Sequence, residues 1–119
     1  MEALLQTCTA AGASPHVVAL LEMPYPLTGR IGADYWCGPE LCNVVADGTR
    51  GWGVTVLLRD GVQCLGTVVE SHWVAVAIRD RLLGEFVVVA AYLPLASKGA
   101  GRVTYGEYWA GMLESARRL

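Results

Sequence analysis

The sequence lacks several features that would place it in a specialised class. It has no apolar stretch of the ~18 to 20 residues that a membrane-spanning helix requires. Its start, MEALLQTC, has neither the basic segment nor the long apolar centre of a signal peptide. Its 9 basic and 11 acidic residues form no block of one sign, and no basic stripe marks a dedicated nucleic-acid binder. We therefore expect an intracellular protein with no membrane partner.

Cysteine motifs are also missing, as are internal repeats and low-complexity tracts. The four cysteines, Cys8, Cys37, Cys42 and Cys64, form no C-x-x-C pair and have no nearby His to complete a zinc set. Metal binding through sulfur is therefore not expected. Reduced thiols are the default for an intracellular chain, with a Cys37–Cys42 disulfide in a loop as the alternative.

What the sequence has in excess is apolar residues. Glycine and the apolar residues other than Tyr make up 73 of 119 positions, well above the ~45 to 50% that is usual in soluble domains. The length suits one domain with one core. Such a chain is either a small, very well-buried domain or a piece of a larger one whose cut surface is still apolar.

The most apolar segment is Gly84–Pro94, GEFVVVAAYLP. An unbroken Val-rich run of this kind predicts a central strand that is buried on both faces. Pro94 ends regular pairing because it cannot donate to a sheet ladder. Tyr92 is therefore expected at the carboxyl end of a core strand, where ligands collect in open α/β sheets.

A second apolar run, His16–Leu21, has the same design, with Glu22 in the place of Tyr92 and Pro24 two residues later. If both strands lie in one sheet, a carboxylate and a phenol converge at one rim. A divalent cation would favour the ionised Glu22, and Tyr92 could bond a phosphate oxygen. From spacing alone, however, a solvated or Arg-paired Glu and a core Tyr are the more common cases.

The other expected elements follow from local patterns. Asp60-Gly61 is a strong hairpin signal, and Thr104 with Glu107 forms a capping box. The expected elements are a helix at Met1–Ala11, mostly loop over Tyr25–Arg50 with short strands near Tyr35 and Asn43, a hairpin of Val54–Arg59 with Val62–Leu65, a strand at Glu70–Ile78, and a helix from Thr104 with Tyr105, Tyr108, Trp109, Met112, Leu113 and Ala116 on its apolar face.

Three stretches in this order resemble the endonuclease/exonuclease/phosphatase superfamily, particularly the apurinic-type endonuclease domains of non-LTR retrotransposons. HVVALLE is similar to the family's strand ending in a metal-binding Glu. The stretch R-G-W-G-V-T-V-L-L-R, Arg50–Arg59, is similar to its Gly-rich entry into a hairpin, and Tyr92-Leu93-Pro94 to its Y-x-P strand end. Leu21, Met23 and Leu95 depart from residues common in the family, which are Gln, Thr and a polar residue.

The resemblance implies Mg²⁺-dependent hydrolysis of nucleic-acid phosphodiesters, with Glu22 as metal ligand and Tyr92 as the catalytic residue that positions the phosphate. It also implies that residues 1–119 form a single partial domain, without the family's first strand, its Gly-Asp-x-Asn strand and its Asp-His pair. The implied fold is α/β, a partial four-layer sandwich consisting of roughly one largely antiparallel mixed sheet with flanking helices.

Two functional hypotheses follow. The first is a truncated hydrolase domain with DNA or another nucleic acid as its partner, inactive as the isolated chain. The second is a non-catalytic remnant that binds other proteins or self-associates through a sheet edge or apolar face. Its partners would be a homo-oligomer or the remainder of a larger polyprotein.

Overall fold

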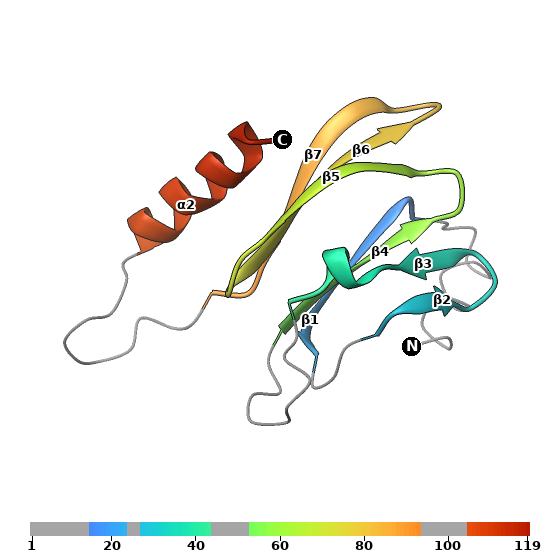
Figure 1. Cartoon of the computed structure of the whole chain (residues 1–119), viewed down its shortest axis with the longest axis horizontal. Coiled ribbons are helices and arrows are strands. Elements are labelled where there is room, and N and C mark those ends of the chain that lie inside the picture. Colours follow the sequence, from blue (N-terminus) through green and yellow to red (C-terminus); the bar gives the residue numbers. More distant parts are fainter. Residues whose placement is uncertain (1–14, 24–26, 44–52, 94–104) are drawn as a thin grey trace.

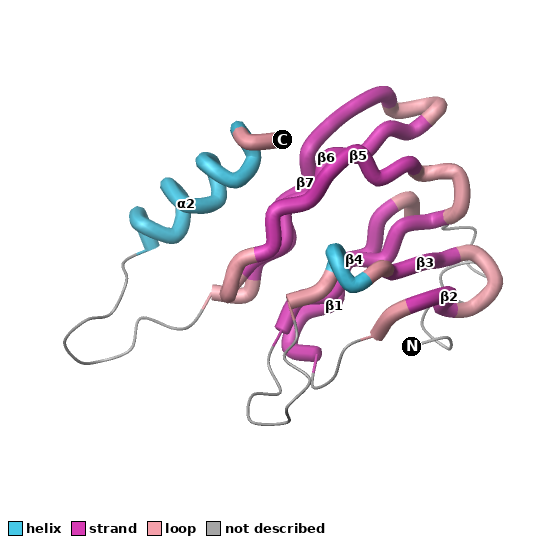
Figure 2. Tube along the Cα trace, in the orientation of Figure 1, coloured by secondary structure: helices cyan, strands magenta, loops and turns pink. Residues whose placement is uncertain are grey.

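The computed structural model describes residues 15–23, 27–43, 53–93 and 105–119 (Figure 1). The helix expected at Met1–Ala11 lies outside these residues. The elements are β1 (Val17–Met23), β2 (Gly29–Ile31), β3 (Tyr35–Cys37), the 3₁₀ turn η1 (Pro39–Leu41), β4 (Gly53–Arg59), β5 (Gln63–Val69), β6 (Trp73–Asp80), β7 (Gly84–Ala91) and α2 (Tyr105–Arg117). Strands dominate, and α2 is the single α-helix of the described residues (Figure 2).

The strands form two antiparallel sheets. One has four strands in the order β1-β4-β3-β2, and the other has three in the order β5-β6-β7. β4 contacts β6 and β7, and α2 contacts β6 and β7, so helix, three-stranded sheet and four-stranded sheet follow one another as layers (Figure 1). The described residues thus form two facing antiparallel sheets with a single α-helix, an arrangement compatible with the α/β class, and the expectation of roughly one sheet is wrong.

The expected hairpin at Asp60-Gly61 explains this difference. The turn does form: Val62 N donates to Arg59 O at 3.0 Å, and Gly61 has a φ of 95° that favours glycine. The strands on either side do not pair, because β4 already lies between β1 and β3. The turn therefore carries the chain from one sheet to the other.

β4 and β6 are the central strands of their sheets, and both are buried on both faces. Residues 53–58 of β4 and 74–78 of β6 are all buried. In β6, Val74, Val76 and Ile78 belong to the core cluster shared with the four-stranded sheet. Ala75 and Ala77 alternate with them and face α2, where small side chains let the helix approach.

The prediction that Gly84–Pro94 contains a central strand is wrong in one respect. The strand forms at Gly84–Ala91, but it lies at the edge of the three-stranded sheet, and Val87 is 40% exposed. Its inner side chains, Phe86 and Val88 among them, pack against the core. A run of apolar residues cannot distinguish a central strand from an edge strand whose outer face is apolar.

α2 packs closely on β6. The Trp73 indole Nε1 donates to Ser115 Oγ at 3.0 Å, and a Cβ at Gly111 would lie 2.7 Å from Trp73 Cη2. The ring of His72, just before β6, meets that of Tyr108 edge to face at 5.3 Å between centroids. The absence of a side chain at Gly111 thus allows the Trp73 ring to fit under the helix.

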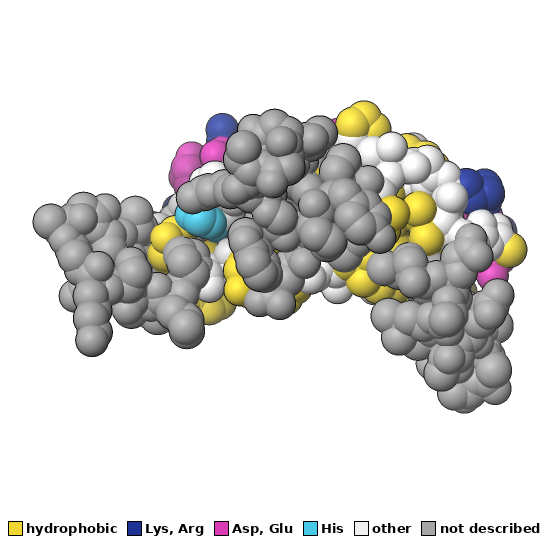
Figure 3. Space-filling model, turned by 90° about the horizontal axis from the view of Figure 1, so that it is seen from below, with side chains coloured by type: hydrophobic (Ala, Val, Ile, Leu, Met, Phe, Trp, Pro, Cys, Tyr) yellow, Lys and Arg dark blue, Asp and Glu magenta, His cyan; other side chains and the backbone are white. Residues whose placement is uncertain are grey.

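The apolar face predicted for this helix is only half buried. Tyr108 and Met112 are buried against the sheet, whereas Trp109 is 62% and Leu113 52% exposed. Other apolar side chains also reach the surface, as the view from below shows between the grey residues (Figure 3). None of the helical segments that the structure describes has the length and apolar character of a membrane span.

Candidate functional site

The two strands that carry Glu22 and Tyr92 belong to different sheets but finish at the same end of the layered pair. Met23 of β1 pairs with Gly53, the first residue of β4, and Ala91 of β7 pairs with Trp73, the first residue of β6. The starts of β4 and β6 lie at the same end, since Asn43 forms hydrogen bonds both to Val54 in β4 and to Glu70, which precedes β6. The condition of the sequence prediction, that both strands lie in one sheet, is not met, because β1 and β7 belong to different sheets.

Residue 22 lies where the pairing of β1 with β4 becomes irregular. Leu20 pairs with Thr55 and Met23 with Gly53, so the register shifts by one between them and Glu22 falls inside the irregular step. Bulges redirect side chains, and they are common beside active sites. The structure places the backbone of Glu22 and does not describe its side chain.

Tyr92 directly follows β7. Its N–H donates to His72 O at 2.9 Å, which continues the β6–β7 ladder by one step. Its side chain is half-buried and packs against the core cluster. The expectation that Tyr92 is a core aromatic is therefore confirmed for its ring.

Asn43 ties the two sheets together at this end, and sequence reasoning assigned it no role. Its Oδ1 accepts from Val54 N at 2.7 Å, and its Nδ2 donates to Glu70 O at 2.8 Å. Its own N–H donates to Val54 O at 3.1 Å. Val54 is in β4, and Glu70 begins the turn into β6. No local pattern marks this Asn, because its partners lie 11 and 27 residues away.

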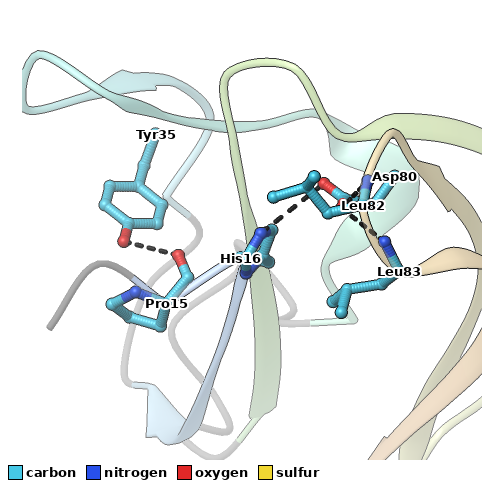
Figure 4. Close-up of polar contacts among 6 residues, drawn as sticks. All are labelled: Pro15, His16, Tyr35, Asp80, Leu82 and Leu83. Carbon is cyan, nitrogen blue, oxygen red and sulfur yellow. Dashed lines mark hydrogen bonds and ion pairs between the residues drawn. The ribbon is translucent and has the colours of Figure 1, made fainter.

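At the opposite end, a second set of polar contacts holds the sheets together (Figure 4). His16, just before β1, places Nε2 3.6 Å from Oδ1 of Asp80, the last residue of β6. The other Asp80 oxygen, Oδ2, accepts from the N–H groups of Leu82 and Leu83 at 2.9 and 3.0 Å. These two backbone hydrogen bonds, followed by His16 and Arg59, lower the pKa of Asp80 against the opposing effect of burial.

The His16 side chain is half-buried between the two sheets. Its Nε2 is buried and accepts or donates no hydrogen bond within the described residues. Asp80 is its ionic neighbour across the sheets. Nearby, the Tyr35 hydroxyl donates to Pro15 O at 2.7 Å, which fixes the approach of the chain to β1 (Figure 4).

The cysteines that the structure describes, Cys37, Cys42 and Cys64, are free thiols. The Cys37–Cys42 disulfide considered from sequence is therefore not present in this structure. Burial first, then Cys42 and Glu40, raises the pKa of Cys37 to about 12, and burial also raises that of Cys64. The raised pKa favours the thiol over the reactive thiolate at both residues.

Within residues 15–23, 27–43, 53–93 and 105–119, no three His, Cys, Asp or Glu side chains come together as a metal-binding group. The described residues thus form two antiparallel sheets and one helix, and polar contacts join the sheets at each end. Comparisons with family models, curated proteins and solved structures find no match for this chain.

Proposed function

We propose that this chain is part of a Mg²⁺-dependent domain of the endonuclease/exonuclease/phosphatase type that hydrolyses nucleic-acid phosphodiesters. The observation that carries the proposal is the position of residues 22 and 92. Glu22 is the penultimate residue of β1 and Tyr92 directly follows β7; the two strands belong to different sheets and finish at one end of the layered pair. An intracellular location is part of the proposal because the substrate would be nucleic acid.

The proposal includes a four-layer sandwich as the complete fold. The two facing sheets would be its inner layers, and α2 would belong to one outer layer. The sequence resemblance at Glu22, Arg50–Arg59 and Tyr92-Leu93-Pro94 supports this assignment. The facing of the sheets supports it as well, since sheets that pack face to face share one core.

In this proposal Glu22 would hold the metal and the Tyr92 hydroxyl would orient the phosphate. Mg²⁺, when bound, supplies charge neutralisation on the phosphate and leaving oxygen. The metal keeps several waters and commonly takes only one or two protein carboxylates. The register shift at Glu22 supports the metal role, since it interrupts the ladder where a ligand would approach.

One carboxylate is an incomplete metal site, and the described residues do not complete it. The isolated chain should therefore bind Mg²⁺ weakly and hydrolyse DNA very slowly, because positioning and charge stabilisation supply most of the catalysis in such sites. We expect the purified chain with Mg²⁺ to nick plasmid or abasic DNA no faster than buffer. Robust metal-dependent nicking that Glu22→Gln abolishes would overturn this expectation of inactivity.

Metal binding is tested without activity by adding Mn²⁺ to ¹⁵N-labelled protein. We expect paramagnetic broadening of amide signals around residues 21–23 and 92–93, and its loss in Glu22→Gln. Glu114→Gln, an exposed carboxylate on α2, is the matched control and should keep the broadening. Equal broadening in wild type and Glu22→Gln would remove Glu22 from the metal site and leave the proposal without its metal ligand.

The phosphate role of Tyr92 has a separate readout. Tyr92→Phe keeps the ring that packs against the core and removes the hydroxyl. We expect the folded variant to lose most of the shift changes that a short single-stranded DNA or inorganic phosphate produces near residue 92 in the wild type. Identical titrations for the two proteins would argue against a phosphate contact.

A second candidate function, a non-catalytic interaction module, is favoured by a different observation. An apolar groove of about 330 Å³ lies between β7 and α2, and the exposed Trp109 and Leu113 help to line it. Apolar surface of this kind beside a sheet edge is typical of sites that bind another chain.

A further inference from the structure

The free edge of β7 is the least protected sheet edge in the described part of the chain. β1 and β5, edges of the two sheets, each contain a register shift, and β2 has only three residues. β7 pairs with β6 without interruption over eight residues, from Gly84 to Ala91. Edge strands are usually blocked by bulges, prolines, charges or shortness, and β7 contains one charge and none of the other devices.

The alternation of the β6–β7 ladder shows which backbone groups of β7 point to its free edge. Tyr92 N–H bonds toward β6, to His72 O. Because hydrogen-bonded positions alternate along an antiparallel ladder, Val87, Val89 and Ala91 direct their N–H and C=O groups away from β6. These residues also turn their side chains to the α2 face, and Val89 and Ala91 line the groove. A strand that pairs with this edge would therefore meet both free backbone hydrogen-bonding groups and apolar side chains.

We propose that this edge binds β7 of a second copy of the chain, antiparallel to itself, to form one continuous six-stranded sheet. The inference rests on the interaction-module function and names its partner and its surface. A twofold axis perpendicular to the sheet keeps both helices on one face. The two grooves then lie side by side, and the exposed Trp109 and Leu113 of each copy border the joined strands.

Charge favours this partner and this direction. Glu85 is the one charged residue of β7; it lies near the start of the strand and forms an ion pair with Arg79 on β6. Antiparallel pairing places the two Glu85 carboxylates at opposite ends of the joined strands. Parallel in-register pairing would stack them, at a cost. From Phe86 to Ala91 the edge carries no charge, so two copies meet without repulsion.

The test is sedimentation velocity on the full chain at about 1 to 100 µM, since one strand pair with a small groove should give a Kd on the order of micromolar. Buffer without Mg²⁺ and nucleic acid keeps the result independent of the phosphodiesterase proposal. We expect the mass to rise from 12.7 kDa toward twice that value with concentration.

Two matched proline variants locate the interface. Val89→Pro removes an N–H that faces the free edge of β7 and leaves the bonds to β6 intact. Val69→Pro does the same on β5, where Glu70 N–H bonds to Trp73 O and so directs Val69 outward. Each replaces a Val that follows another Val, and both positions lie on edge strands of the same sheet. We expect Val89→Pro to weaken dimerisation at least tenfold and Val69→Pro to leave it unchanged.

A third variant covers the case in which a proline variant does not fold. Val87→Lys places a charge in each copy at the joined edge, at a side chain that is already 40% exposed, and should also weaken the dimer at least tenfold. A wild-type monomer throughout the concentration range would overturn both the self-association function and this interface. A wild-type dimer that Val89→Pro and Val87→Lys leave intact would overturn the β7 interface alone.

Discussion

His16 Nε2 lies 3.6 Å from Asp80 Oδ1, and this pair joins the residue before β1 to the last residue of β6. It is a link between the two sheets at the end opposite to Glu22 and Tyr92. Asp80 is the better-bound partner, since Oδ2 also accepts from the Leu82 and Leu83 amides. One carboxylate oxygen thus stabilises the turn between β6 and β7, and the other faces His16 beside the four-stranded sheet.

Acid should weaken the fold through Asp80. The folded protein lowers the pKa of this group below its ordinary 3.8, so the carboxylate contributes stability above that pH, and the contribution is lost as pH falls through the lower folded value. We expect Asp80→Asn to melt at a lower temperature at pH 7 and to lose less stability below about pH 4 than the wild type. Exposed Asp34→Asn should keep the wild-type melting temperature at pH 7, and a similar loss there would show that Asp80 has no special role.

Gly111→Ala should destabilise the protein although alanine favours helices. The new methyl would lie 2.7 Å from Trp73 Cη2, and overpacking typically costs about 1 to 3 kcal/mol, more than the ~1 kcal/mol of helix propensity gained. Urea denaturation followed by tryptophan fluorescence measures the difference. Gly106→Ala, at an exposed position of the same helix, should be neutral or stabilising. Stabilisation in both variants would mean that Trp73 moves aside freely.

Asn43→Asp should loosen the end of the sheets that carries the candidate site. The substitution keeps the acceptor for Val54 N–H but loses the donor and directs a charge at Glu70 O. We expect a loss of about 1 to 3 kcal/mol in unfolding free energy, the usual cost of a half-buried polar group without its partner. The same amide-to-acid change at exposed Gln63 should cost little. Faster amide exchange of Val54 in Asn43→Asp would locate the effect.

Cys37 should resist alkylation in the folded protein. Its pKa of about 12 keeps the thiol protonated at pH 8, and the side chain is buried. We expect iodoacetamide with peptide mass spectrometry to leave Cys37 unmodified until denaturant is added. Rapid native labelling at pH 8 would show that the strand β3 opens locally.

Much of the secondary structure could be predicted from local patterns. The alternation and Val content of residues 54–59 and 74–78 indicated strands, and the capping pattern with apolar spacing indicated α2. The assignment of strands to sheets could not be read locally. Asp60-Gly61 predicts a turn correctly, but whether its flanking strands pair depends on β1 and β3, which compete for β4 from distant parts of the chain.

The candidate site, too, could be predicted only in part from the sequence. Glu22 and Tyr92 were proposed because each follows an apolar run in the sequence, and the contacts that join the two sheets at either end were missed. Asn43 acts through partners 11 and 27 residues away, and His16 meets Asp80 across the sheets. Such contacts have no sequence period, because they depend on where the sheets place distant segments.

The sequence by itself determined most of the strands, the Asp60-Gly61 turn and the last helix, since these depend on side-chain periodicity and on glycine at positive φ. Only the tertiary structure decided that there are two facing sheets, that β7 is an edge, and that Trp109 and Leu113 stay exposed. The physical reason is that hydrophobic burial is non-directional. An apolar side chain is stabilised by burial against any apolar surface. The local sequence therefore does not specify which neighbour, or which copy of the chain, buries it.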